Sequence, residues 1–320
     1  MKLKDKVLEI LASRQGEAIS GEEIAQKIGV TRNAIWKAVN LLKKEGYQIT
    51  SSHASGYVLS NDTEIFNASK IESFSKNDIN VVIVDKATSS NDIAKELAKN
   101  GAPEGTLVVV KEQSNGRGRM GRSFISNEEN GLYMSLILRP KLSAQRAVKI
   151  TVIGAVSALE AIEKTSGVQC SIKWVNDIFI GDKKVCGILT EAAVSIETGM
   201  LDYAILGIGI NITPPKNGFP DEIKDIATSI YSYDAPKDYK SGLCAEVTDK
   251  FLHYYKSIEN EAYIAKYRKK SNLIGKRVDI IRGDEIISGE VIDIDNDANL
   301  VLNSNQHIIR FSSGEARVKK

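Results

Sequence analysis

The sequence is poor in the residues that build disulfide frameworks and histidine- or cysteine-based metal centres. Its 320 residues include only three cysteines and three histidines. The cysteines are isolated, odd in number and without metal-ligand spacing, at Cys170, Cys186 and Cys244. The histidines are equally scattered, at His53, His253 and His307. This pattern excludes a disulfide framework and indicates small buried apolar cysteines in a reducing compartment.

Long apolar stretches are also missing. The sequence contains nothing like a signal peptide and no apolar run of about 18 residues, so we expect a cytoplasmic protein without membrane contact. A hydrophobic content of 42% with 26% charged residues is ordinary for a globular protein with a sizeable core. The length suggests roughly two domains of about 150 residues each.

Excess charge is confined to one end of the chain. The formal net charge is only +2, but residues 1–60 hold nine Lys/Arg and six Asp/Glu, a net of +3. The other 260 residues therefore carry a net charge of −1. This distribution is typical of a small DNA-reading segment attached to a nearly neutral remainder.

The basic segment has the pattern of a helix-turn-helix. Leu3 to Arg14 shows apolar residues at helical spacing. Ser20 and Glu23 form a capping box for a second helix, which Gly29 ends. A third helix is predicted from Thr31 to Glu45, and two short helices joined by a glycine turn are typical of a helix-turn-helix.

The third helix leaves base-reading and phosphate-binding residue types outside its apolar stripe. These candidate DNA-binding residues are Arg32, Asn33, Trp36, Lys37 and Asn40. Two short strands around a Ser/His/Gly turn, 47–50 and 56–59, resemble the wing of a winged helix. The alternative is a small helical protein-interaction domain, which leaves an exposed Trp36 unexplained.

A loop rich in glycine and arginine, Gly116 to Arg122, follows the apolar run Thr106 to Val110. Glycines let the backbone approach a ligand, and arginines bring fixed charge and forked donors. Such a loop suits an anion held by main-chain N–H groups and guanidinium planes. The alternative is a solvated loop that grips nucleic acid without specificity, and the loop alone does not decide between them.

A hairpin further along favours the first interpretation. Gly181-Asp182 lies between two runs of β-branched and aromatic residues, which predicts a two-residue turn. With such a turn, Ile180 pairs with Lys183, Phe179 with Lys184, and Asp177 with Cys186.

Alternation along the strands then places Asp177, Phe179, Lys184 and Cys186 on one face. The carboxylate and ammonium could form a surface ion pair of little energetic value. Beside an arginine-rich loop they favour phosphate handling, with Asp177 directed to a metal ion and Lys184 to an anion.

The remaining pattern is a mixed one. From Asn80 strands and helices alternate, with a long irregular loop around Pro214 to Pro220. After Leu273, four short runs alternate at period two between Gly/Asp/Asn turns, which predicts an antiparallel barrel of about 45 residues.

Together these motifs resemble biotin–protein ligases. The loop reads GRGRMGR, and Lys173 to Asp177 reads KWVND where the family usually has KWPND. Further matches are Thr88 to Asn91 upstream and Gly207 to Asn211 downstream. The resemblance implies an α+β protein: a winged helix-turn-helix at 1–62, a class II synthetase-like mixed α/β ligase domain at 65–271, and an SH3-like barrel at 272–320.

The resemblance also implies a reaction and its partners. Biotin would be activated by ATP and Mg²⁺ to biotinyl-5′-AMP and then joined to a lysine of a biotin carboxyl carrier domain. The N-terminal head would bind operator DNA, as an adenylate-responsive repressor of biotin genes, and the protein would form a homodimer. The alternatives are a biotin-sensing repressor without catalysis, and a lipoate-type acyl-protein ligase.

Site residues are carried over by motif. We expect Arg119 and Lys184 to neutralise the carboxylate and α-phosphate, and Asp177 to bind Mg²⁺. The biotin and adenylate set is Ser89, Ser90, Asn91, Gln113, Arg117, Gly118, Arg119, Lys184, Gly207 and Asn211. The nucleotide-side set is Gly116, Arg122, Lys173 and Asn176.

Some of these residues have simpler explanations. The Ser89 to Asn91 run also caps a helix, and Gln113 could be structural. Trp174 is expected in the core. Because an arginine-rich loop without an anion should lack compensating charge, residues 115–124 are predicted to be mobile until ligand binds.

Overall fold

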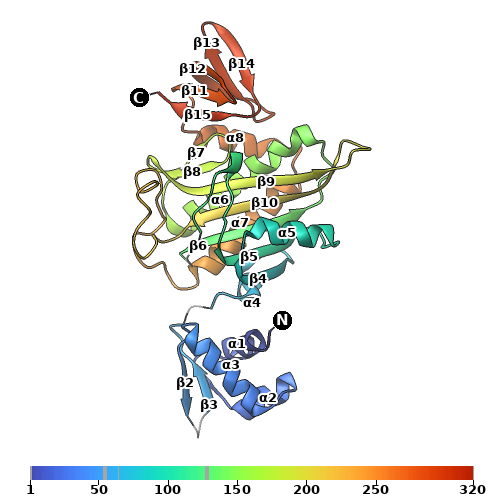
Figure 1. The fold of residues 1–320 in the computed structure, drawn as a ribbon, viewed down its shortest axis with the longest axis vertical. Helices are drawn as coiled ribbons and strands as arrows, with labels where there is room; N and C mark the ends of the chain where they lie inside the picture. The colour runs from blue at the N-terminus through green and yellow to red at the C-terminus, as the bar shows by residue number, and fades with distance from the viewer. Residues whose placement is uncertain (1, 53–55, 64, 127–129, 320) are drawn as a thin grey trace. The chain divides into compact units, whose positions relative to one another are not determined.

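The computed structural model describes residues 2–52, 56–63, 65–126 and 130–319. The chain divides into two compact units (Figure 1). The first contains residues 1–70 and 236–241, and the second contains residues 71–235 and 242–320. No helix in the described ranges is long and apolar enough to cross a membrane.

The first unit is a winged helix-turn-helix. Its elements are α1 (Leu3–Ser13), β1 (Ala18–Ile19), α2 (Gly21–Ile28), α3 (Arg32–Lys44), β2 (Ile49–Ser52) and β3 (Gly56–Leu59). The Ser20 hydroxyl accepts from the Glu23 amide, and Gly29 ends α2 with a φ of 77°, as the sequence predicts. The strands form a small antiparallel sheet in the order β1-β3-β2. Residues 53–55 of the predicted Ser/His/Gly turn lie outside the described residues.

Apolar side chains from all three helices form the core of this unit. Val7 and Leu11 of α1 meet Ile24 of α2, and Ile35 and Leu42 of α3. Each of these five side chains is at most 1% exposed. The opposite face of α3 is therefore left to solvent, where the sequence predicts the DNA-reading residues.

The second unit is built on a seven-stranded sheet with the order β4-β5-β6-β10-β9-β8-β7. Its strands are β4 (Asn80–Ala87), β5 (Thr106–Gln113), β6 (Gly131–Leu138), β7 (Ser171–Lys173), β8 (Asp177–Ile180), β9 (Lys183–Val194) and β10 (Leu201–Asn211). β4 and β5 are parallel, and every other neighbouring pair is antiparallel. The central strands β5 and β6 are almost wholly buried, which explains their continuous apolar sequences.

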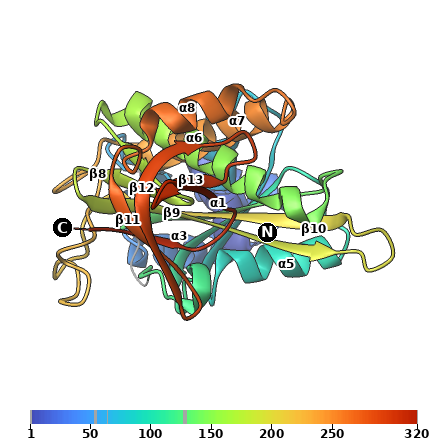
Figure 2. The ribbon, with the colours of Figure 1, turned by 90° about the horizontal axis from the view of Figure 1, so that it is seen from above.

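Helices cover the two faces of this sheet unequally. The helices are α4 (Ala68–Phe74), α5 (Ser90–Lys99), α6 (Val148–Ser166), α7 (Tyr239–Tyr255) and α8 (Ala262–Lys270). Figure 2 shows α6, α7 and α8 on one side of β9 and β10 and α5 on the other. α5 packs mainly on β5, β6 and β10. On the α5 side of the sheet, the surface of β9 is therefore left to the arginine-rich loop and a pocket.

A five-stranded antiparallel sheet follows, in the order β14-β13-β12-β11-β15. Its strands are β11 (Arg277–Arg282), β12 (Glu285–Ile294), β13 (Leu300–Ser304), β14 (His307–Phe311) and β15 (Glu315–Val318). Trp174 is 4% exposed, and its indole N–H donates to the Ala298 carbonyl at 2.9 Å. The expectation that Trp174 belongs to the core is confirmed, as is the expected α+β architecture.

Candidate functional site

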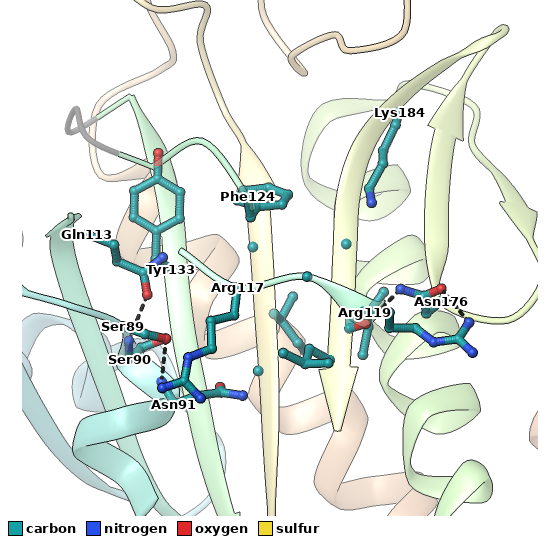
Figure 3. Close-up of a pocket in the computed structure, with 17 residues that line it drawn as sticks. Ser89, Ser90, Asn91, Gln113, Arg117, Arg119, Phe124, Tyr133, Asn176 and Lys184 are labelled. Carbon is teal, nitrogen blue, oxygen red and sulfur yellow. Dashed lines mark hydrogen bonds between the residues drawn. The ribbon is translucent and has the colours of Figure 1, made fainter. Parts of the chain in front are cut away.

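One pocket lies on the α5 face of the sheet, between the start of α5, the arginine-rich loop and the β8–β9 hairpin (Figure 3). Sequence-predicted residues that line it are Ser89, Ser90, Asn91, Gln113, Arg117, Gly118, Arg119, Asn176, Lys184 and Gly207. These residues come from six separate stretches of the chain. The fold therefore gathers most of the predicted biotin and adenylate set around one cavity.

A buried polar network forms one wall of this pocket. The Gln113 side-chain oxygen Oε1 accepts from the Ser90 backbone amide at 2.7 Å, and Gln113 Nε2 donates to Ser126 Oγ at 2.9 Å. Ser135 Oγ lies 2.8 Å from Ser90 Oγ and 2.6 Å from Asn91 Oδ1. Buried polar groups that are all hydrogen-bonded specify one rigid arrangement, so this wall is preorganised.

Two glycines of β10 make room for side chains over the sheet. A Cβ on Gly207 would lie 2.2 Å from Asn91 Oδ1, and a Cβ on Gly209 would lie 2.8 Å from the Phe124 ring. Phe124 also meets Tyr133 edge-to-face, with ring centroids 6.4 Å apart. The glycines allow close approach to the sheet, and in this structure Asn91 and Phe124 occupy the space.

Glu191 of β9 connects the polar wall to the arginine-rich loop. It accepts from the Asn91 side-chain amide at 2.7 Å and pairs with Lys95 at 2.8 Å and Arg117 at 3.3 Å. Arg117 also pairs with Asp92 of α5. Burial alone would raise the pKa of Glu191, but hydrogen bonds from Lys95 and Asn91 outweigh it and hold that pKa below its usual range.

The hairpin has the predicted turn and one error in its predicted register. Ile180 pairs with Lys183 and Phe179 with Lys184, as expected. A bulge between Ile178 and Phe179 shifts the remainder, so Asp177 pairs with Gly187 and not with Cys186. An extra residue in one strand cannot be read from alternation alone, because it interrupts the two-residue period.

The bulge leaves Lys184 and Asp177 on the same side, as predicted. Lys184 Nζ lies 2.7 Å from Asp177 Oδ1, although the contact is not aligned as a hydrogen bond. A Cβ on Gly187 would lie 3.1 Å from Lys184 Nζ, so glycine there gives the ammonium room. Figure 3 shows Lys184 directed into the pocket that Arg119 also lines.

Arg119 enters the pocket from the opposite side to Arg117 (Figure 3). Its guanidinium donates to the Asn176 side-chain oxygen at 3.2 Å, and Asn176 in turn donates to the Ile188 carbonyl at 2.9 Å. Burial lowers the pKa of Arg119, and the nearby Asp177 carboxylate opposes that shift. Arg119 is thus a partly desolvated cation held in a fixed position.

The loop is better compensated than its sequence suggests. Arg117 pairs with Asp92 and Glu191, and Arg122 pairs with Glu315 of β15. The premise that the loop lacks compensating charge without a ligand is therefore wrong. The partners lie 25 to 193 residues away along the chain, and no local pattern connects them to the loop.

Several predicted residues do not line the pocket itself. Lys173 lies over the Phe179 ring, 5.8 Å from its centroid, and Asn211 donates to the Thr228 carbonyl at 2.9 Å. Gly116 borders a second, more open groove between the loop and residues 215–221. Asp177 contacts Lys184, and no group of three or more His, Cys, Asp or Glu able to hold a metal occurs among the described residues.

Sequence reasoning missed four residues at or beside the pocket: Ser135, Glu191, Phe124 and Tyr133. Ser135 lies in the middle of an otherwise apolar strand, where a fully buried hydroxyl signals a polar partner. Glu191 similarly interrupts an apolar run. Phe124 lies two residues after the arginine-rich loop and has no signal of its own.

The outer face of α3 forms a second candidate site, in the first unit. Arg32, Asn33, Trp36 and Lys37 are exposed, and Asn40 is half-buried. No ion pair involves Arg32 or Lys37 within the part of the chain that the structure describes. Residues 32–44 include four Lys/Arg and no acidic residue, so every charged side chain on α3 is positive.

Three family models match the chain in the order of its parts. Residues 4–58 match an HTH domain, residues 81–211 match the biotin/lipoate A/B protein ligase family, and residues 273–318 match the biotin protein ligase C-terminal domain.

Whole-chain relatives agree with these matches. The chain is 35% identical to the bifunctional ligase/repressor BirA of Bacillus subtilis, covering 98% of both chains. It is 24% identical to BirA of Escherichia coli, covering 98% of this chain and 96% of that one. The structure resembles biotin protein ligase from Aquifex aeolicus in complex with biotin and ATP. That match has a TM-score of 0.63 and 27% identity, and covers 75% of this chain and 99% of the other.

Proposed function

The chain belongs to the biotin protein ligase family, as a bifunctional ligase/repressor, and we propose that the pocket beside α5 is where it activates biotin. The overall activity is ATP-dependent biotin–protein ligation. The roles given below to individual residues, to DNA and to a second copy of the chain are our proposals.

One observation carries the assignment of the site. Lys184 and Arg119 come from different elements, and both line the same cavity. Each is positioned by a neighbour, Asp177 at 2.7 Å and Asn176 at 3.2 Å respectively. Activation brings a carboxylate close to a phosphate, so positioned cations stabilise the charge that the reaction concentrates.

The proposed reaction has two steps. A carboxylate oxygen of biotin attacks the α-phosphorus of ATP, the bond to the bridging oxygen breaks, and pyrophosphate leaves. The deprotonated amine of the acceptor lysine then attacks the acyl carbon, and AMP leaves with the electrons of the acyl–oxygen bond. Lys184 and Arg119 hold the carboxylate and α-phosphate oxygens near each other, which lowers the entropic part of the barrier.

The polar wall suits the urea head of biotin. Ser89 Oγ accepts from the Asn91 amide at 3.2 Å. The single hydroxyl hydrogen of Ser135 is taken by Asn91 Oδ1 at 2.6 Å, so Ser90 donates to Ser135 Oγ across their 2.8 Å contact. Among the described residues, the Ser89 hydroxyl donates to no acceptor. The Ser89 hydroxyl hydrogen can therefore point to a urea oxygen, while the Phe124 ring supplies an apolar wall.

The nucleotide would extend from this pocket along the arginine-rich loop, past Gly116, Asn176 and Arg122, with Lys173 nearby. Mg²⁺ in nucleotide sites is usually held by one or two carboxylates together with the phosphates. Asp177 can supply one such carboxylate, since it lies at the pocket edge and already contacts Lys184. A bound magnesium ion would neutralise phosphate charge.

Pyrophosphate release tests the ligase assignment. Purified protein with ATP, Mg²⁺ and biotin should release pyrophosphate and label the lysine of a biotin carboxyl carrier domain. Release with lipoate but not biotin would establish the lipoate alternative. Biotin binding without any release would establish a regulator without catalysis.

We further propose that the first unit binds operator DNA through α3 and that the protein works as a homodimer. A C2 dimer would present two heads to a two-fold operator, with half-sites a fixed distance apart. β9 extends past the short strand β8, and no described strand pairs with its outer edge beyond Ile188. Three exposed apolar residues follow near the hairpin end, Val194, Ile196 and Met200.

An exposed strand edge with apolar neighbours is a ready interface for a second copy. If the arginine-rich loop in its ligand-bound form favours that dimer, biotinyl-adenylate binds the dimer more tightly than the monomer. The adenylate then raises the dimer population and so strengthens DNA binding. Sedimentation with and without ATP and biotin measures the dimer. If operator affinity is the same with and without the adenylate, the first unit binds DNA constitutively and the ligand does not regulate it.

A further inference from the structure

Trp36 is the large apolar side chain that α3 leaves most exposed. Its exposed fraction is 54%, whereas the only other tryptophan, Trp174, is 4% exposed. Among the described residues, Trp36 has no recorded hydrogen bond for its indole N–H and no recorded partner for its ring. An indole in that state gains stability only when a partner covers it.

The surroundings of Trp36 specify the class of partner. Arg32 and Asn40 lie one helical turn to either side, because residues four apart share a face. Four cationic residues and no acidic one occur along α3. The face is therefore complementary to a polyanion, with one apolar ring among its polar side chains.

The chemistry of indole narrows the choice of base. Indole offers an apolar ring and one N–H donor, and it has no acceptor. In the major groove, cytosine and adenine present amino groups that need an acceptor, whereas thymine presents a C5 methyl group and the O4 acceptor. Thymine is thus the base edge whose two features both match those of Trp36.

We propose that Trp36 is a specificity-determining residue that reads a thymine in each operator half-site, packing its ring against the C5 methyl group. This inference rests on the proposed DNA-binding function of α3. Arg32, Asn33 and Asn40 suit guanine and adenine edges, and Lys37 suits a phosphate. Trp36 therefore supplies the apolar part of the readout that its neighbours lack.

Deoxyuridine substitution isolates the methyl group. The full-length protein, with ATP, Mg²⁺ and biotin, is first used to select duplexes from a randomised library. Each thymine of a selected duplex is then replaced singly by deoxyuridine, which removes only the C5 methyl. Affinity measured by fluorescence anisotropy should fall about fourfold for each methyl that Trp36 covers, the effect of burying one such group.

Variants of the protein connect that loss to Trp36. Trp36→Ala should bind more weakly and lose the response to deoxyuridine at those positions, whereas Trp36→Phe should keep the response. Leu41→Ala is the matched control, since Leu41 is 46% exposed on the same helix. It points about 140° away from Trp36 around the helix axis. It should leave both affinity and response unchanged.

The outcomes separate this inference from the function it rests on. The thymine assignment would be overturned if deoxyuridine lowered the affinity of the wild type and of Trp36→Ala equally. It would also be overturned if deoxyuridine had no effect at any position of a specifically bound duplex. Either result would leave the DNA-binding proposal standing. A uniform loss of affinity across all sequences in Trp36→Ala would make Trp36 a backbone contact. Failure to select any duplex would overturn the DNA-binding proposal itself, and the thymine assignment with it.

Discussion

The protein carries two clusters of cationic side chains, and they differ in what surrounds them. In the arginine-rich loop, Arg117 and Arg122 each pair with a carboxylate, and Arg119 is held by Asn176. On α3, Arg32 and Lys37 form no ion pair with any described residue. Both clusters look alike in the sequence, as short basic segments with small or polar neighbours.

The difference indicates two kinds of anion. Cations fixed by protein partners and partly desolvated suit a small ligand that must be held in one geometry. Cations left to solvent suit a polyanion, where affinity comes from released counterions and depends on salt. The comparison predicts that mutations in the loop will change the rate of pyrophosphate release. Mutations on α3 will instead change the salt dependence of DNA affinity.

The largest effect is expected from removing a positioned cation. Lys184→Ala and Arg119→Ala should each slow pyrophosphate release with biotin roughly ten- to hundredfold, the value of one charge-assisted hydrogen bond. Neither side chain belongs to the core, so the free energy of unfolding should hardly change. Single-turnover pyrophosphate release and urea unfolding measure the two quantities.

Lys183→Ala is the matched control for Lys184. Lys183 is the preceding residue of the same strand, and its ammonium donates to the Lys224 carbonyl at 2.8 Å. It should keep its rate. A rate loss in Lys183→Ala equal to that in Lys184→Ala would mean that general charge, and not a positioned ammonium, drives the reaction.

The next effect concerns the rigid wall behind the loop. Gly207→Ala would place a Cβ 2.2 Å from Asn91 Oδ1 and so displace Asn91 from Ser135 and Glu191. We expect a loss of about 1–3 kcal/mol in the free energy of unfolding, as for other overpacked positions. Biotin affinity by calorimetry should fall as well.

The helix α7 offers a glycine control. A Cβ on Gly242 would meet nothing within 4 Å, so Gly242→Ala should be neutral or slightly stabilising. Unchanged stability in Gly207→Ala would show that the polar wall is adaptable. The fixed geometry attributed to the loop side would then lose its support.

On α3 the expected change is smaller and has a different signature. Arg32→Ala or Lys37→Ala should weaken DNA binding severalfold and reduce the slope of log affinity against log salt by about 0.9 if the residue contacts one phosphate. Ligation should be unaffected. Anisotropy titrations over a range of salt concentrations measure the slope, and a slope that does not change would contradict a phosphate contact.

The sequence predicts local features of this fold well. Helix ends at Ser20 and Gly29, the Gly181-Asp182 turn and the buried Trp174 all follow from residues within a few positions of one another. Most of the pocket lining came from short motifs. What sequence reasoning missed depends on distant contacts, such as Arg122 with Glu315, 193 residues apart.

The bulge in β9 teaches the same lesson on a smaller scale. Alternation predicts which residue of β9 pairs with Asp177 only while the period holds, and the extra residue, Val185, is accommodated by the sheet rather than signalled by composition. Ser135 was overlooked because apolar neighbours identify β6 as core. The role of the Ser135 hydroxyl is visible only when α5 is packed on β6, because its partners Ser90 and Asn91 lie at the start of α5.

The smallest effect tests the pairing that distinguishes the two clusters. Glu191→Gln keeps an acceptor for Asn91 but removes the charge that faces Lys95 and Arg117. The side chain is 24% exposed, so at neutral pH the free energy of unfolding should fall by only about 1 kcal/mol or less. Urea unfolding at several pH values measures the difference from wild type.

The pH dependence of that difference has a definite sign. The pKa of Glu191 is lowered in the folded protein, so its charge stabilises the fold above the unfolded pKa of about 4.3. The difference between wild type and Glu191→Gln should therefore be full at neutral pH and shrink as pH falls below that value. The same substitution should increase protease cleavage within residues 115–124 of the empty protein, because Arg117 loses one of its two carboxylate partners. Cleavage equal to wild type would mean that Asp92 alone holds Arg117, and that the loop needs less pairing than the comparison with α3 implies.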